Sequence, residues 1–472
     1  MNEKYHIVMI GAGAGGLQCA IHATGRGVRC ALIDGMEVGG ECLQYGCIPS
    51  KSMVQSMDTY RLVKNASAMG IDIGGDIAYN FSRIMARQKA VVNGIVGRVH
   101  KGLSKMKIDF YRGTGSVTSP NKVTIRPNNP QPEQEREITL ETENIVIGTG
   151  SSPNRLSIPG ADLPGVLTNR EIFDLKNLPK SMVVIGCGYV GVELATIFAS
   201  MGTRVKMLEK EEFLMGFDQK IAQIVRHSIE ERQGVNVEID LNVLEIQHTD
   251  AGLYNVVYEK DDQERSAQGE VVLMATGRTP YTEALWDGDI RIAMDGPGIA
   301  VNEYLETSVQ GIYALGDVLN GAMTAFTAAT EGEVVADNCL GKRVSIDYSA
   351  VPRCVFTYPA YACVGLNEEE ANSTEGLDYG IAEYPFRAIA MADIMNETEG
   401  FIRLIYEKGS GKILGGHIVG AHASELIAEL TLAVHQGLNV KELASVLHFH
   451  PSLAEGLQRA ARVGWLMEDM GK

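Results

Sequence analysis

Two cysteines, Cys42 and Cys47, stand five positions apart in the glycine-containing run 39–51 and could act as a thiol–disulfide pair. A disulfide between them closes so short a ring that it gains less than the ~3 kcal/mol expected for a loop of about 15 residues. Stability is therefore a poor reason for this bond. Zinc ligation and two unrelated thiols remain alternatives, although no second cysteine–histidine pair with the spacing of a zinc site is evident. The pattern favours redox exchange without a metal.

A pattern of strand, glycine turn, helix and strand occurs twice in the chain. Apolar residues 5–10 and 181–185 each lead into a glycine-rich turn, a helix-like stretch and a second apolar run that ends at an acidic residue. The acidic residue follows the first glycine by 23 positions in both copies. The first copy contains Gly11, Gly13, Gly16 and Asp34, and the second contains Gly186, Gly188, Gly191 and Glu209.

Each part of this pattern has a role in binding a dinucleotide. The first glycine makes a tight turn, the second lets the backbone approach a pyrophosphate, and the third allows the helix to pack closely on the strand. The helix N-terminus offers free N–H groups to phosphates, and the acidic residue accepts hydrogen bonds from a ribose diol. Glycine turns that bind nothing remain the alternative interpretation. The repeat predicts two dinucleotide sites.

A cysteine pair beside one nucleotide site, with a second site elsewhere, implies an electron path. Nicotinamide delivers two electrons as hydride and a disulfide accepts them through thiolate chemistry, so a flavin is the natural relay. We therefore expect FAD in the first copy and a nicotinamide nucleotide in the second. Glu209 favours NAD over NADP because a carboxylate there repels a 2′-phosphate, although Arg204, Lys206 and Lys210 nearby weaken this preference.

Thiol exchange also needs a group that handles protons near pH 7, and imidazole suits that task. His448 and His450 lie in a C-terminal run that continues with Pro451 and reaches Glu455. Pro451 is suited to the first position of a helix, which would place Glu455 early in that helix and within hydrogen-bonding reach of His450. A purely structural histidine is the alternative interpretation.

The composition sets the frame for these motifs. The chain has 472 residues, a hydrophobic content of 45% and a formal net charge of −17, which argue for a globular protein and against nucleic-acid or anionic membrane surfaces as partners. No stretch approaches the roughly 18 apolar residues of a membrane-spanning helix. The first apolar run leads directly into a glycine turn, so a cleaved secretory leader is not expected. The sequence predicts a cytoplasmic protein.

Proline- and glycine-rich segments divide the chain into parts of an α/β protein. We expect two Rossmann-like dinucleotide-binding domains and a C-terminal α+β dimerisation domain. The predicted boundaries are 1–150 and 281–347 for the two parts of the FAD-binding domain, 151–280 for the NAD-binding domain and 348–472 for the dimerisation domain. An exposed hairpin loop is expected at 126–137. The apolar spacing at 424–436 predicts an amphipathic helix.

Taken together, these motifs resemble the flavin-dependent pyridine nucleotide–disulfide oxidoreductases over nearly the whole chain. The resemblance rests on both glycine patterns and on four further runs, at residues 39–51, 275–280, 314–317 and 450–455. It implies that Cys42 is the interchange thiol that attacks the substrate disulfide and that Cys47 faces the flavin. Lys51 resembles the residue near flavin N5, and Glu193 is its expected ion-pair partner.

The same resemblance implies the remaining cofactor contacts. Asp34 corresponds to the acid on the adenosine ribose of FAD, and Asp317 to the acid that binds its ribityl chain. Gly150 and Gly277 are expected to line the cofactor sites, and Tyr189 stands where some relatives place an aromatic gate over the nicotinamide.

Within the family the chain most closely resembles the members that oxidise protein-bound dihydrolipoamide with NAD⁺. This implies a homodimer in which His450 and Glu455 reach the cysteines of the opposite subunit. The implied partners are the lipoyl domains of 2-oxoacid dehydrogenase or glycine-cleavage complexes. An NAD(P)H-dependent reductase of another low-molecular-weight disulfide is the alternative, and a non-catalytic nucleotide-binding subunit is a more distant one.

One residue of the redox run departs from the family pattern. Glu41 stands where relatives usually have threonine. A carboxylate beside Cys42 is expected to disfavour its thiolate and to slow exchange with anionic substrates.

Overall fold

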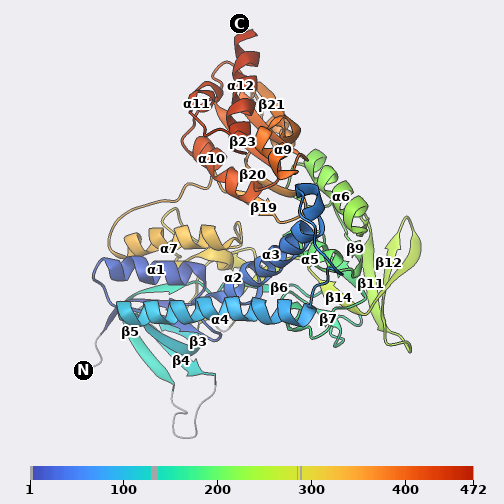
Figure 1. Ribbon diagram of the computed structural model, residues 1–472. Helices are drawn as coiled ribbons and strands as arrows, with labels where there is room; N and C mark the ends of the chain where they lie inside the picture. The colour runs from blue at the N-terminus through green and yellow to red at the C-terminus, as the bar shows by residue number, and fades with distance from the viewer. Residues whose placement is uncertain (1–3, 129–136, 284, 287–289, 471–472) are drawn as a thin grey trace. The chain divides into compact units, whose positions relative to one another are not determined.

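The computed structural model describes residues 4–128, 137–283, 285–286 and 290–470 (Figure 1). The chain folds as two compact units, each built from segments that are distant in sequence. Unit 1 comprises Met1–Arg155, Thr168–Asn177 and Gly277–Ile346. Unit 2 comprises Leu156–Leu167, Leu178–Thr276 and Asp347–Lys472.

Unit 1 is built on a parallel sheet whose strands lie in the order β3, β2, β1, β5 and β18. Strands β3 and β5 extend beyond this sheet and pair antiparallel with β4. The apolar residues of β1 are buried on both faces, as is usual for a central parallel strand. The strands are β1 (Tyr5–Ile10), β2 (Cys30–Asp34), β3 (Asp109–Ser119), β4 (Lys122–Pro127), β5 (Ile138–Ile147) and β18 (Ile312–Ala314).

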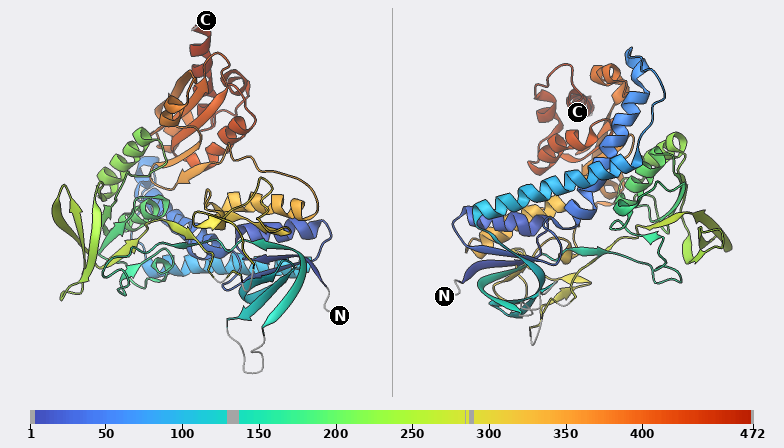
Figure 2. Two further views of the ribbon diagram at one scale, coloured as in Figure 1. Left: turned by 180° about the vertical axis from the view of Figure 1, so that it is seen from behind. Right: turned by 60° about the horizontal axis from the view of Figure 1, so that its bottom comes forward.

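Helices α1 (Ala14–Gly25) and α7 (Ala325–Cys339) of unit 1 run side by side, dark blue and yellow-orange in Figures 1 and 2. Small residues allow this close approach, since a Cβ on Gly332 would lie 2.4 Å from the Gly15 carbonyl oxygen. The other elements of unit 1 are α2 (Gly40–Tyr45), α3 (Cys47–Lys64), α4 (Phe81–Met106), β6 (Ser151–Pro153), β15 (Arg278–Pro280), β16 (Met294–Asp295), β17 (Gly298–Ile299) and the short 3₁₀ helices η1 (Ala66–Met69), η2 (Ile172–Asp174) and η3 (Gly316–Leu319).

Unit 2 contains a second parallel sheet, in the order β10, β9, β8, β14 and β7, and an antiparallel sheet of β11, β12 and β13. Helix α5 (Tyr189–Ser200) connects β8 to β9 and is buried along most of its length. The other elements are β7 (Val166–Leu167), β8 (Ser181–Ile185), β9 (Arg204–Leu208), α6 (Gln219–Gln233), β10 (Asn236–Glu238), β11 (Asn242–His248), β12 (Tyr254–Lys260), β13 (Gln263–Gly269) and β14 (Val271–Met274).

The C-terminal part of unit 2 is an antiparallel sheet in the order β19, β20, β23, β22 and β21, with helices packed on it. Ile427, Leu430 and Ala433 of α10 (Ala423–His435) are buried, which confirms the amphipathic helix expected at 424–436. The other elements are β19 (Arg353–Val355), β20 (Ala360–Gly365), α8 (Glu368–Ser373), β21 (Tyr379–Pro385), η4 (Phe386–Ala388), α9 (Ala390–Met395), β22 (Phe401–Glu407), β23 (Ile413–Gly420), α11 (Val440–Ser445) and α12 (Glu455–Met470).

This architecture confirms the predicted α/β class with two parallel dinucleotide-type sheets and a C-terminal α+β region. The hairpin loop expected at 126–137 falls largely outside the described residues, although its flanking strands β4 and β5 are paired. Among the described residues, no helix is both long and apolar enough to cross a membrane.

Candidate active site

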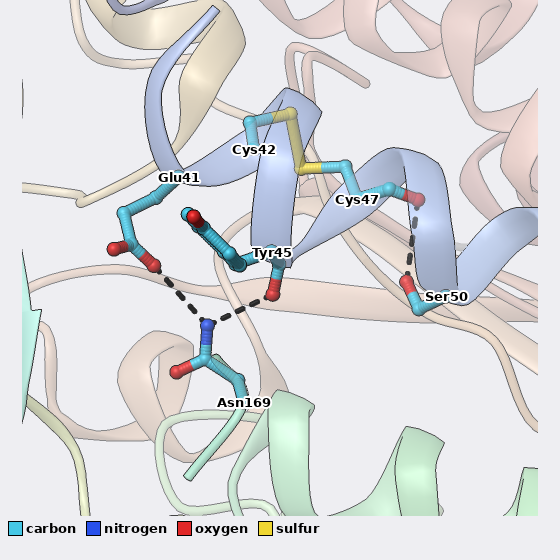
Figure 3. The surroundings of a disulfide bond; sticks show 6 residues. All are labelled: Glu41, Cys42, Tyr45, Cys47, Ser50 and Asn169. Carbon is cyan, nitrogen blue, oxygen red and sulfur yellow. Dashed lines mark hydrogen bonds between the residues drawn. A yellow bond between two sulfur atoms is a disulfide. The ribbon is translucent and has the colours of Figure 1, made fainter. Parts of the chain in front are cut away.

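Cys42 and Cys47 form a disulfide that joins helices α2 and α3, with their Cα atoms 4.8 Å apart (Figure 3). Cys47 is the first residue of α3, a helix of 18 residues. The N-terminus of a helix stabilises a nearby negative charge, so Cys47 is well placed to leave as a thiolate when the bond is opened. Lys51 lies one helical turn further along α3.

The disulfide region is attached to the first glycine-rich turn. The Gly39 N–H donates to the Ala12 carbonyl at 2.8 Å, and a Cβ on Gly40 would lie 2.9 Å from the Gly13 Cα. The redox pair and the predicted FAD turn are therefore one rigid piece of unit 1.

The glycine turn of unit 1 has the geometry of a phosphate cradle. Gly11 has a φ of 117°, and a Cβ on Gly16 would lie 2.0 Å from the Gly11 carbonyl oxygen. A Cβ on Gly13 would meet no described atom within 4 Å, which leaves room for a ligand at the N-terminus of α1. These features fit the dinucleotide expected from the sequence.

Asp34, at the end of β2, closes this turn. Its carboxylate accepts from the backbone N–H groups of Ala12 at 2.7 Å and Met36 at 2.8 Å. Burial raises the pKa of Asp34, although both backbone hydrogen bonds oppose that effect.

The second glycine turn, in unit 2, repeats this geometry. Gly186 has a φ of 106°, and a Cβ on Gly191 would lie 2.1 Å from the Gly186 carbonyl oxygen. The space around Gly188 is open in the same way as at Gly13 among the described atoms. Glu209 accepts from the backbone N–H groups of Cys187 at 2.5 Å and Glu211 at 3.0 Å. The structure therefore places the two predicted sets of residues in matching positions.

Lys206, one of the basic residues that weaken the preference for NAD, is engaged elsewhere. Its ammonium lies 2.9 Å from Glu238 and donates to the Tyr258 hydroxyl at 2.9 Å. Although burial opposes the effect, hydrogen bonds from Lys206 and Tyr258 lower the pKa of Glu238 to about 2. Glu238 therefore remains an anion that holds Lys206.

Asp317, in η3, belongs to a series of polar contacts that extends to Glu41 on α2, the helix that contains Cys42. The Ser151 hydroxyl donates to Asp317 at 2.6 Å, and Arg278 donates to the same hydroxyl at 2.7 Å. Arg278 also lies 3.4 Å from the carboxylate of Glu41. Gly150 precedes Ser151 and Gly277 precedes Arg278, so the two predicted glycines flank these contacts, each with a positive φ.

Glu41 is surrounded by donors. Arg170 forms an ion pair with it, and Asn169 donates to it at 3.2 Å (Figure 3). The charge expected to disfavour the Cys42 thiolate is thus compensated by Arg170 and Arg278, and Figure 3 shows the carboxylate directed away from the sulfur atoms.

His450 and Glu455 meet in unit 2 as expected. The Glu455 carboxylate lies 2.9 and 3.0 Å from His450 Nδ1. The expectation that Pro451 begins the helix is wrong, because α12 begins at Glu455. Residues 451–454 form turns instead, in which Ser452 N–H donates to the Glu455 side chain and Gly456 N–H donates to the Leu453 carbonyl.

Two further predicted residues lie on α5 in unit 2. Glu193 is buried and accepts from the Phe356 N–H at 3.1 Å. Tyr189 begins α5 beside the second glycine turn and packs edge-on against Phe217, with ring centroids 5.2 Å apart. The pairing of Glu193 with Lys51 stays a prediction.

Sequence reasoning missed Asn169, Arg170 and Ser151. Arg278 lies in the run 275–280, but its partners cannot be read from that run. Among the described residues, no cluster of three or more His, Cys, Asp or Glu side chains is arranged to hold a metal ion.

Comparisons with known proteins give a family match, related sequences and, as the third finding, a solved structure. Residues 5–332 match the family described as pyridine nucleotide-disulphide oxidoreductase, and residues 351–461 match the dimerisation domain of that family. Dihydrolipoyl dehydrogenase of Bacillus subtilis strain 168 is 33% identical over 97% of this chain and 95% of the relative. The corresponding enzyme of Geobacillus stearothermophilus is 34% identical over the same shares.

The third finding is a solved structure. A Cu(II) complex of the HOCl-induced flavoprotein disulfide reductase RclA from Escherichia coli has a TM-score of 0.85 and 29% sequence identity. The match covers 98% of this chain and 99% of that one.

Proposed function

The chain belongs to the pyridine nucleotide–disulphide oxidoreductase family, and we propose that it oxidises dihydrolipoamide with NAD⁺ through its Cys42–Cys47 disulfide. The observation that carries this proposal is the disulfide at the start of α3, attached to a glycine-rich dinucleotide cradle. The similarity to two dihydrolipoyl dehydrogenases supports the choice of substrate.

As a member of this family the chain uses FAD and NAD(H). In this proposal the cradle of unit 1 holds FAD, with Asp34 on its ribose and Asp317 on its ribityl chain. The cradle of unit 2 holds the nicotinamide nucleotide, with Glu209 on its ribose. When bound, FAD supplies a two-electron carrier between a dithiol and the nicotinamide.

The chain's own residues carry out the thiol chemistry. His450 accepts the proton of one substrate thiol, and the resulting thiolate attacks Cys42 Sγ, which breaks the Cys42–Cys47 bond and releases the Cys47 thiolate. The second substrate thiol then attacks the substrate sulfur of the mixed disulfide. That attack releases oxidised lipoamide and leaves Cys42 and Cys47 with the two electrons.

The partner proposals follow from the same chemistry. The dimerisation domain at 351–461 supports a homodimer. In it, His450 and Glu455 would serve the cysteines of the opposite subunit, and Lys51 would pair with Glu193 near the flavin. The protein-borne substrate would be the lipoyl domain of a 2-oxoacid dehydrogenase or glycine-cleavage complex.

A second candidate is an NAD(P)H-dependent reductase of another small disulfide. The likeness to a flavoprotein disulfide reductase over 98% of the chain favours it. The departure at Glu41 favours it as well, since this residue lies beside the interchange cysteine.

Steady-state rates of the purified yellow protein separate the two candidates. We expect NAD⁺-dependent oxidation of dihydrolipoamide to exceed NADH-dependent reduction of glutathione disulfide in kcat/KM by at least about 100-fold. Anaerobic dihydrolipoamide should also produce a long-wavelength absorption band after two electrons, and Cys42→Ser should lose dihydrolipoamide turnover while keeping NADH-to-dye activity. Faster turnover of the small disulfide would favour the second candidate.

A further inference from the structure

Glu41 is the residue of the redox run that the proposed chemistry leaves unused. Its side chain is 19% exposed, and its carboxylate contacts Arg170, Asn169 and Arg278. Arg170 contacts Oε1 with both Nε and Nη2, Asn169 Nδ2 donates to Oε2 at 3.2 Å, and Arg278 Nη2 lies 3.4 Å from Oε2. These contacts hold the carboxylate in one position.

The side chain of Asn169 forms hydrogen bonds with both ends of helix α2. Its amide donates to Glu41 in the first turn and to the carbonyl of Tyr45, the last residue of the helix, at 2.9 Å (Figure 3). Carbonyl groups at a helix C-terminus lack partners within the helix, so this bond satisfies one of them. Asn169 is itself buried, with 6% of its surface exposed.

Helix α2 depends on such contacts because it is short. It has six residues, far fewer than an isolated helix needs to be stable in water. It lies between Gly39 and Gly46, neither of which has a side chain that could cap it. The disulfide anchors Cys42 to α3 in the oxidised protein, but that anchor is absent whenever the bond is open.

We propose that Glu41, Asn169, Arg170 and Arg278, here called the Glu41 clamp, are positioning residues that hold Cys42 opposite Cys47 while the two are thiols. The inference rests on the proposed function only in that Cys42 and Cys47 exchange electrons, and it does not depend on the substrate.

The clamp also connects α2 to the predicted flavin contacts. Arg278 donates to the hydroxyl and carbonyl of Ser151, and its Nε lies 3.8 Å from Asp317. The guanidinium of Arg278 thus lies between the carboxylates of Glu41 and Asp317, and that of Arg170 pairs with Glu41. Removal of Glu41 therefore takes a carboxylate away from both guanidinium groups, and removal of Arg170 takes away a cation that contacts Glu41.

The clamp has a measurable effect on the thiol–disulfide equilibrium. Two thiols held in position lose little further chain entropy when they join, so the effective concentration of one at the other is high. Without the clamp, α2 keeps its contacts with the glycine turn but loses those made by Glu41 and by the Tyr45 carbonyl, so Cys42 is held less firmly while the bond is open. The disulfide then becomes easier to reduce.

The test is equilibration of the full-length holoprotein with buffers of reduced and oxidised dithiothreitol, in which one enzyme disulfide exchanges for one disulfide of the reagent. The dithiol fraction is measured by alkylation and mass spectrometry of the peptide containing Cys42 and Cys47. We expect Glu41→Gln and Arg170→Gln each to shift the equilibrium about tenfold toward the dithiol. The double variant should shift no further than the larger single one, because both remove the same pair.

Arg155→Gln is the matched control, since Arg155 pairs with Glu171 at 3.4 Å in the same unit. It should stay within about twofold of the wild type. Asn169→Ala removes the amide bridge but keeps both charges, so it supplies the same test, with a smaller shift, if the charge variants do not fold. Shifts below twofold in all three clamp variants, or additive shifts in the double variant, would overturn the clamp. A wild-type pair that dithiothreitol never reduces would instead overturn the proposed function.

Discussion

At the scale of single residues, Glu455 determines how His450 presents its ring. The hydrogen bond from His450, together with one from the Ser452 N–H, lowers the pKa of Glu455. The carboxylate is therefore an anion at neutral pH, and it favours the tautomer in which Nδ1 carries the proton. Nε2 is then left as the acceptor that a base requires.

Glu455→Gln should weaken the preference of His450 for this tautomer while keeping the imidazole ring in the protein. We expect kcat for dihydrolipoamide to fall about 10- to 100-fold, less than the loss of a general base itself would cause. NADH-to-dye activity should be unchanged, because it bypasses the thiols. Glu468→Gln on the same helix is the control, since the Glu468 carboxylate accepts from the Gly409 N–H. Equal loss of both activities in Glu455→Gln would contradict the positioning role.

The residues found by sequence reasoning are those whose partners lie close in the chain or at a repeated spacing. Asp34 and Glu209 were predicted because each ends an apolar run at a fixed distance from a glycine turn, and His450 and Glu455 are only five positions apart. Arg170 and Glu41 are 129 positions apart. No periodicity or local motif connects them, so only the folded chain reveals the pair.

At the scale of elements, the two glycine turns show how little space separates helix from strand. The third glycine of each turn faces the carbonyl of the first at a distance that admits no Cβ. Any side chain there must push the helix N-terminus away from the phosphate position.

Gly16→Ala should therefore weaken the binding of FAD. A Cβ would lie 2.0 Å from the Gly11 carbonyl oxygen, so we expect a protein that purifies with less than about a tenth of the wild-type flavin content. The measurement is the ratio of flavin to protein absorbance. Gly25→Ala, at the end of the same helix, is the control because a Cβ there meets no described atom within 4 Å. Full flavin content in Gly16→Ala would be evidence against this cradle.

Strand positions were predicted well and helix starts less so. Strands β1 and β8 have the predicted bounds because their apolar runs are buried between neighbours in parallel sheets. The start of α12 was misplaced because proline tolerates a turn as readily as the first turn of a helix. Residues Thr168–Asn177 belong to unit 1 although the segments on either side of them belong to unit 2. This placement depends on contacts with residues that are distant in sequence, so the local composition does not predict it.

At the scale of the whole molecule, a buried histidine links stability to pH. His417 is fully buried in β23, where its Nδ1 lies 2.9 Å from the Tyr361 hydroxyl and its Nε2 lies 3.1 Å from the Leu366 carbonyl oxygen. Burial lowers the pKa of His417 to about 4. The unfolded chain, in which histidine has its ordinary pKa near 6.5, takes up a proton first as the pH falls.

Stability should therefore decline as the pH falls from about 6.5 to about 4, and this group should have no effect above that range. Between pH 7 and pH 5 it should remove about 2 kcal/mol from the free energy of unfolding. His417→Asn keeps polar atoms for both partners but does not titrate. Urea unfolding of both proteins at the two pH values measures the difference, and parallel losses would contradict the assignment.

The dimer itself can be tested by combining two inactive proteins. If each active site takes its cysteines from one subunit and His450 from the other, Cys42→Ser and His450→Gln homodimers both lack dihydrolipoamide turnover. A heterodimer of the two, however, contains one site with both cysteines and an intact histidine, and one site that lacks both functions.

Co-expression of the two variants should therefore restore activity. Random pairing makes about half of the dimers heterodimers with one working site each, so we expect about a quarter of the wild-type activity. Tandem affinity tags isolate the heterodimer, which should reach about half of the wild-type rate. If His450 instead served the cysteines of its own subunit, no combination would contain the pair in one chain, and the tagged heterodimer would be as inactive as its parents.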